Sequence, residues 1–354
     1  MAYACKVVAD SYYTRKDATY RVTTMIVKFP RLVLAEFNTH RVFSRNSASS
    51  RAIPVRKQLQ ALVKDVFTPN SIGTAVGGMN AGPALEGEAL DKAIAVWGDA
   101  ANSQMWYALS MTTSPDYVER EWEKWVLEEN DEFGDFVMDV TKRIEDREHP
   151  IHQEAMLWTT KGLTNRLLEP FMWHEVIVTA TEWGNFFNLR TDANAQEEIR
   201  TIAEMMKAAY DASTPELLAE GEWHLPFIQP EEKGWAKEHP ELAVKAVTAR
   251  AARVSYLTHD TGVVDLDKDY GLANGLRANG HMSPYEHACT PFTKKEWKLR
   301  RDAMKAIHKS KHLDAVPSYV SAQILKSLEF AGNFRGWGQA RREIPNEDVF
   351  QLAA

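Results

Sequence analysis

Residues 26–51 read IVKFPRLVLAEFNTHRVFSRNSASSR, and this stretch carries the main expectations for the fold and the site. The apolar, β-branched run that leads into it from Thr23 predicts a strand that ends near Phe29. Proline has no backbone N–H and a fixed φ, so the chain should bend at Pro30 and enter a short helix over Arg31–Arg41. A serine-rich, basic loop follows.

The window from Phe37 to Lys64 contains no acidic residue, although the whole chain has a net charge of −7. Its basic residues are Arg41, Arg45, Arg51, Arg56, Lys57 and Lys64. Hydroxyls, backbone N–H groups and guanidinium forks together bind phosphate well. The loop therefore indicates an anion site, and a solvated basic face is the alternative that charge alone leaves open.

Composition is that of an ordinary globular protein, with 44% hydrophobic and 26% charged residues in 354. No apolar run approaches a membrane span, and the first residues lack the features of a secretory signal, so we expect a cytoplasmic protein. The chain has only two cysteines and neither is in a CxxC pair, which argues against a disulfide framework or a cysteine metal site and leaves a single disulfide between Cys5 and Cys289 as the alternative. The acidic balance argues against stable nucleic-acid binding.

Other segments carry simpler patterns. Residues 68–92 are rich in glycine and proline and predict a surface loop, whereas 118–147 predict a solvent-facing helical insertion. Trp173–Thr181 fits a buried strand or an apolar helix equally well. An amphipathic helix is predicted over Ala195–Ala212, with a capping box from Asn194 to Glu197. Further helices are predicted over 270–278 and 294–311.

Four blocks carry a family resemblance. HRVFSRNSASSR (40–51) resembles the signature RHRxxSxNxxSxR of flavin-dependent thymidylate synthases, with Thr39 in place of the first arginine. RLLEP (166–170) and NFFNLRTDANAQEEIR (185–200) resemble two further blocks of that family. ARVSY (252–256) and GHMSPYEH (280–287) resemble its N-terminal pair, which here comes last, so the chain looks circularly permuted.

The resemblance covers residues 20–57, 160–215 and 246–292 of a single domain over 1–354. It leaves an insertion at 65–150 and a basic tail at 294–354 outside. It implies an α+β fold, with a central mixed or antiparallel sheet flanked by long helices and carrying the helical insertion. It also implies a homotetramer whose active sites lie at subunit interfaces. In the permuted order, residues near 292 should lie close to residues near 20.

Residue roles follow from the matching positions. The resemblance implies that the nucleotide is bound by Ser49, Ser50, Arg51, Arg166 and Arg190. It implies that the flavin is contacted by His40, Arg41, Val42, Asn185, Ser255, Ser283 and Glu286. It also implies catalytic roles for Arg190 beside the pyrimidine and for His281 at the mouth of the cleft. The chain departs from the family's pattern at three positions, Thr39, Glu36 and Ser47. We expect the tail to replace the lost hydrogen-bond donors to the phosphate with Arg335, Gln339, Arg341 and Arg342.

The implied reaction is methylation of dUMP to dTMP, with FAD as cofactor and NADPH and methylenetetrahydrofolate as co-substrates. It needs no cysteine nucleophile, and neither Cys5 nor Cys289 has an evident activating partner. A hydroxymethylase or methylase of dUMP or dCMP is the alternative within the enzyme class. A non-catalytic nucleotide-binding module and an RNA-binding protein are the alternatives outside it.

Overall fold

The computed structural model describes residues 3–77, 81–111, 120, 159–256, 265–309 and 327–344. Its fold is α+β, built on a five-stranded mixed sheet with the order β3-β6-β2-β1-β7. The strands are β1 (Ala4–Arg15), β2 (Ala18–Pro30), β3 (Ser44–Ser47), β6 (Trp173–Ala180) and β7 (Glu216–Leu217). All neighbours are antiparallel except β1 and β7.

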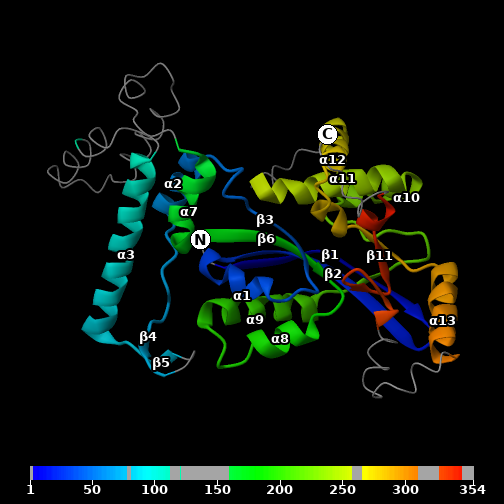
Figure 1. Cartoon of the computed structure of the whole chain (residues 1–354), viewed down its shortest axis with the longest axis horizontal. Helices are drawn as coiled ribbons and strands as arrows, with labels where there is room; N and C mark the ends of the chain where they lie inside the picture. The colour runs from blue at the N-terminus through cyan, green and yellow to red at the C-terminus, as the bar shows by residue number, and fades with distance from the viewer. Residues whose placement is uncertain are drawn as a thin grey trace.

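Helices cover both faces of this sheet (Figure 1). One face packs against α1 (Leu34–Asn38), α8 (Gly184–Arg190) and α9 (Glu197–Ala212), and the other carries α11 (Pro240–Arg253). The alternation of strand side chains explains the two layers. Met25 and Val27 lie in the α9 core, whereas Ile26 between them packs with the α11 core.

The remaining elements surround this centre (Figure 1). The helices are α2 (Val55–Lys64), α3 (Gly87–Ser110), α7 (Lys161–Leu168), α10 (Lys233–Glu238), α12 (Leu266–Ala278) and α13 (Lys294–Lys309). The 3-10 turns are η1 (Arg31–Val33), η2 (Glu169–Phe171), η3 (Pro230–Glu232), η4 (Val254–Tyr256), η5 (Ser283–Glu286) and η6 (Ala340–Glu343). Short strand pairs are β4 (Gly73–Ala75) with β5 (Ala81–Ala84), β8 (Cys289–Pro291) with β11 (Trp337–Gln339), and β9 (Phe330–Ala331) with β10 (Phe334–Arg335).

The strand, bend and helix predicted from residues 23–41 are confirmed, although α1 ends at Asn38. Trp173–Thr181 resolves as strand β6, because it pairs with β2 and β3 on either side. The helices predicted near 270–278 and 294–311 are also present as α12 and α13. The strand before Pro30 and the two helices have strong local patterns, which explains why the sequence alone suffices for them, whereas β6 is decided by its pairing with β2 and β3.

Two predictions are wrong. The segment 68–92 is not a plain loop, since it forms the β4–β5 pair and the start of α3. Asn194 does not cap α9; its amide and backbone N–H instead donate to Asp192, and α9 begins at Glu197 without a side-chain cap. The helical insertion predicted at 118–147 falls outside the described residues, apart from Arg120.

Residues near 292 do lie close to residues near 20. Phe292 and Trp297 share one apolar cluster with Tyr20, and the Trp297 ring lies 5.4 Å from the Tyr20 ring. This proximity is what the permuted order predicts. Among the described helices, none is both long and apolar enough to cross a membrane.

Candidate functional site

A polar cleft lies at the β3 edge of the sheet, with a cavity volume of about 410 Å³. Its lining comes from η1, β3, the loop after β3, α7, η4 and η5. The lining residues are Arg31, Arg45, Asn46, Ser47, Ala48, Ser49, Ser50, Arg51, Arg166, Ser255 and Ser283. Four of them are arginines and none is acidic, so the cleft has the character of an anion site.

The serine loop is held in place by buried hydrogen bonds. The amide of Asn165, which has no exposed surface, donates to the carbonyl oxygens of Ser50 at 2.8 Å and Ile53 at 2.9 Å. The backbone N–H of Ser49 donates to the Ser255 carbonyl at 3.1 Å. The loop is thus attached to α7 on one side and to η4 on the other.

Arg31 forms the inner wall of the cleft. Its guanidinium contacts Glu169 Oε1 at 2.9 Å and His174 Nδ1 at 2.9 Å. Burial, and secondly the Arg31 charge, lower the pKa of His174 to about 3, so this ring is neutral and its Nδ1 accepts. Arg31 Nε is buried without a hydrogen-bond partner among the described residues.

Arg51 and Arg166 form the outer wall. Both side chains are exposed, and neither forms an ion pair with a residue that the structure describes. Gly162 on α7 allows Arg51 to lie close to the helix, because a Cβ at this position would approach Arg51 Cγ to 3.0 Å. The two guanidinium groups therefore remain available for an incoming anion.

The cleft unites part of the predicted site. Ser49, Ser50 and Arg51 come from the first matching block, Arg166 from the second, and Ser255 and Ser283 from the last. These residues belong to segments that lie far apart along the chain, and the fold brings them to one cleft. Ser50 is turned inward, where its hydroxyl donates to Glu169 Oε1 at 2.5 Å.

Arg190 and His40 form a separate pair outside this lining. Arg190 Nε donates to His40 Nε2 at 3.0 Å, and Arg190 also donates to Thr39 Oγ1 at 3.1 Å. Burial, followed by the charges of Arg190 and Arg45, lowers the pKa of His40 to about 4. The structure therefore does not bring Arg190 into the same cleft as Arg51 within one subunit.

The other predicted residues are dispersed. Arg41, Asn185 and His281 are exposed and do not line the cleft, and the Val42 carbonyl accepts from Asn333 Nδ2 at 3.1 Å. Glu286 forms an ion pair with Arg341. None of these positions lines the cleft.

The tail does not replace the lost phosphate donors, contrary to our expectation. Gln339 donates to Ser44 Oγ at 3.0 Å and to the Glu286 carbonyl at 3.1 Å, and Arg335 pairs with Glu329 at 2.6 Å. None of the four tail residues, Arg342 included, lines the cleft. Glu36 is also absent from the lining, and its Oε2 is buried without a partner among the described residues. The tail therefore forms hydrogen bonds to β3 and η5.

Sequence reasoning missed Arg31, Arg45 and Asn46 as lining residues. Arg45 and Asn46 stand inside the signature block, so their position was a usable signal. Arg31 follows the Pro30 bend, and only the approach of Glu169 and His174 shows that it faces the cleft.

Neither cysteine is suited to nucleophilic chemistry. Burial raises the pKa of Cys5 to about 12 and raises that of Cys289 well above its ordinary value. Cys289 is fully buried in the cluster around Trp337, and neither thiol lines the cleft. Both groups therefore stay protonated near neutral pH.

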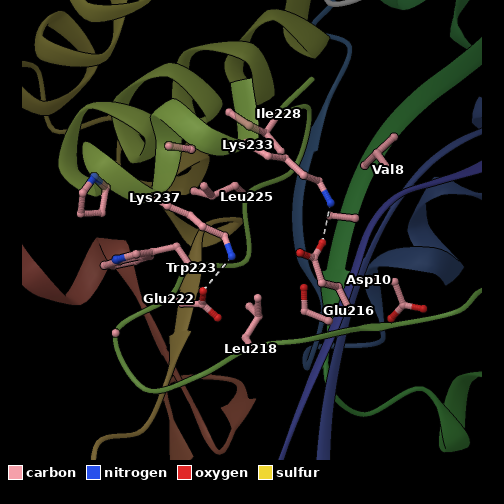
Figure 2. Close-up of a pocket in the computed structure, with 15 residues that line it drawn as sticks. Val8, Asp10, Glu216, Leu218, Glu222, Trp223, Leu225, Ile228, Lys233 and Lys237 are labelled. Atoms are coloured by element: carbon pink, nitrogen blue, oxygen red, sulfur yellow. Dashed lines mark hydrogen bonds and ion pairs between the residues drawn. The ribbon is translucent and has the colours of Figure 1, made fainter. Parts of the chain in front are cut away.

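A second cavity of about 220 Å³ lies between β1 and α10, outside the matching blocks. Its floor is apolar, with Leu218 and Trp223 among the lining residues. At its rim Lys233 contacts Glu216 at 2.6 Å, and Lys237 contacts Glu222 at 3.0 Å (Figure 2). Its charges are thus neutralised locally.

Comparison with protein-family models and with curated proteins gives no match for this chain.

Proposed function

We propose that the cleft binds the phosphate of a pyrimidine deoxynucleotide and that the chain is a flavin-dependent thymidylate synthase-like methyltransferase. The observation that supports this most is that Ser49, Arg166 and Ser255, which come from three of the four matching blocks, line one cleft without acidic lining residues. The proposed reaction converts dUMP to dTMP with methylenetetrahydrofolate and NADPH. The proposed setting is cytoplasmic.

Under this proposal, the residues of the cleft have distinct roles. Arg51 and Arg166 hold the phosphate oxygens through charge-assisted hydrogen bonds, and Arg31 adds positive charge on the inner wall. Ser49 adds a hydroxyl beside Arg51. These contacts are the same in ground and transition states, so they serve mainly binding and orientation.

The chain fits a flavin only in part within one subunit. Ser255 and Ser283 lie on the cleft wall, whereas Arg41 and Asn185 are exposed elsewhere on the surface. A bound FAD would supply the hydride for the reaction, which removes the need for a thiol nucleophile. Complete sites then require a homotetramer, in which Arg41, Asn185 and the His40–Arg190 pair face the cleft of a partner subunit.

The direct test is titration of the purified chain with FAD, followed by reduction with NADPH and addition of methylenetetrahydrofolate and dUMP. We expect FAD to bind at micromolar concentration and its reduced spectrum to return to the oxidised form with one dTMP formed per turnover. Absence of FAD binding rejects the proposal. Product analysis with dCMP in place of dUMP distinguishes the hydroxymethylase or methylase alternative.

Nucleotide binding is tested separately from the flavin. Arg51→Ala should weaken dUMP binding, and Arg301→Ala is the matched control, because Arg301 is exposed on α13 outside the cleft. FAD binding without dUMP binding leaves a flavoprotein of another reaction class. Binding of dUMP without FAD supports the non-catalytic module instead.

A further inference from the structure

A chain of hydrogen-bonded side chains crosses the α11 face of the sheet and connects the cleft with the second cavity. Its members in order are Asn46, His287, Thr179, Thr24, His224 and Ser11, at successive distances of 3.0, 2.8, 2.7, 2.8 and 2.9 Å. Asn46 lines the cleft and Ser11 lines the second cavity. The four residues between them are at most 1% exposed, so bulk water does not interrupt the chain.

The orientation of the chain is decided at Asn46. One end of its amide faces the backbone carbonyls of Arg45 and Ser283, each at 3.2 Å. A carbonyl only accepts, so this end is the NH₂ group, while the amide oxygen accepts from the Ser283 hydroxyl at 3.1 Å. The same NH₂ group lies 3.0 Å from His287 Nε2, which must therefore be the unprotonated nitrogen of that ring.

Both histidines of the chain are neutral. Burial lowers the pKa of His224 to about 4, and burial together with the neighbouring His224 lowers that of His287 to about 3. A neutral imidazole has one donor and one acceptor nitrogen, so the proton of His287 is on Nδ1 and points to Thr179.

The remaining protons follow from this start. The Thr179 hydroxyl accepts from His287 and donates to Thr24, because it makes no other side-chain hydrogen bond with the described residues. Thr24 in turn donates to His224 Nε2, which places the His224 proton on Nδ1, facing Ser11 Oγ. The opposite direction would set a ring N–H against the Asn46 NH₂ group.

We propose that this chain makes Asn46 a positioning residue of the cleft and couples the orientation of its amide to the hydroxyl of Ser11 in the second cavity. Each member can reverse only if its neighbours reverse, because each buried group has a single proton to donate. The cleft therefore presents a fixed pattern of donor and acceptor at Asn46. At the other end, the Ser11 proton points to no described acceptor and suits an acceptor atom of a molecule in the second cavity.

The test determines the tautomer of each histidine from the imidazole ¹⁵N chemical shifts of the full chain labelled at histidine. His224→Gln and His287→Gln assign the two signals. Both rings should carry the proton on Nδ1. In Asn46→Asp at pH 8 the carboxylate only accepts, so both rings should move to the Nε2–H form. Reversal at the distant His224 is the decisive result.

Two variants at Thr24 provide the controls. Combined with Asn46→Asp, Thr24→Val should confine the reversal to His287, whereas Thr24→Ser should let it reach His224 again. A His224 tautomer that ignores Asn46→Asp overturns the proposal, as does Nε2–H at either ring in the unmodified chain. If the valine variant does not fold, Asn46→Asp alone still decides. No ligand is needed, so the outcome is independent of the nucleotide test.

Discussion

In the cleft, four arginines stand on the wall with no acidic lining residue, whereas in the second cavity each lysine of the rim has its own glutamate. Both cavities border the same sheet, and both are backed by a buried neutral histidine, His287 or His224. The difference is therefore one of charge pairing. Arg51 and Arg166, which form no ion pair with a described residue, keep their charge available to an external anion, whereas Arg31 is paired with Glu169 and the rim lysines are paired with their glutamates.

The histidines behind the two cavities should give the largest effect, because they are buried in their neutral form. The pKa of His224 is about 4 and that of His287 is about 3, both below the unfolded value of 6.5, so the unfolded state binds more protons as the pH falls. Each histidine should then cost about 1.4 kcal/mol of stability per pH unit below pH 6.5. Urea unfolding at pH 7, 5.5 and 4.5 measures this loss.

His224→Gln should make the pH dependence of unfolding shallower by about one proton. An unchanged slope in His224→Gln would show that His224 is charged or exposed in the folded state.

Arg51→Ala should give the next largest effect, on the cleft alone. Loss of a hydrogen bond to a charged group costs about 1.5–3 kcal/mol, which corresponds to roughly tenfold to hundredfold weaker dUMP binding. Calorimetric titration with dUMP and with inorganic phosphate measures it. Comparable weakening in Arg301→Ala would mean that the anion binds through general charge and not in the cleft.

Gly162→Ala should have a smaller effect of the same kind. The new Cβ would approach Arg51 Cγ to 3.0 Å, so the guanidinium must shift by a few tenths of an ångström. We expect about threefold weaker phosphate binding without loss of thermal stability, since alanine is the better helix former. Unchanged affinity would show that Arg51 reaches the anion by another rotamer.

Lys233→Ala should have the smallest effect and tests the second cavity. Its ion pair with Glu216 is half exposed, so removal should change stability by about 0–1 kcal/mol and leave phosphate affinity unchanged. Titration of the variant with phosphate checks this directly. A clear loss of phosphate binding would place an anion site in the second cavity and remove the contrast between the two.

The sequence by itself determined the elements with strong local patterns. The apolar run before Pro30, the stripe of α9 and the basic helix α13 follow from side-chain periodicity and from the missing N–H of proline. It also predicted an anion site at the serine loop, because that prediction depends on residue types and spacing alone.

Only the tertiary structure decided which of the predicted residues meet. Strand pairing sets Asn46 opposite Ile177 and Thr24 opposite Thr179, and neither register can be read from one strand. Hydrogen bonds from Asn165 on α7 and to Ser255 on η4 bring these two elements to the serine loop, whereas Arg190 pairs with His40. Contacts between segments that are distant in the chain depend on how whole layers pack, and the local sequence of one segment does not specify which other segment it will contact.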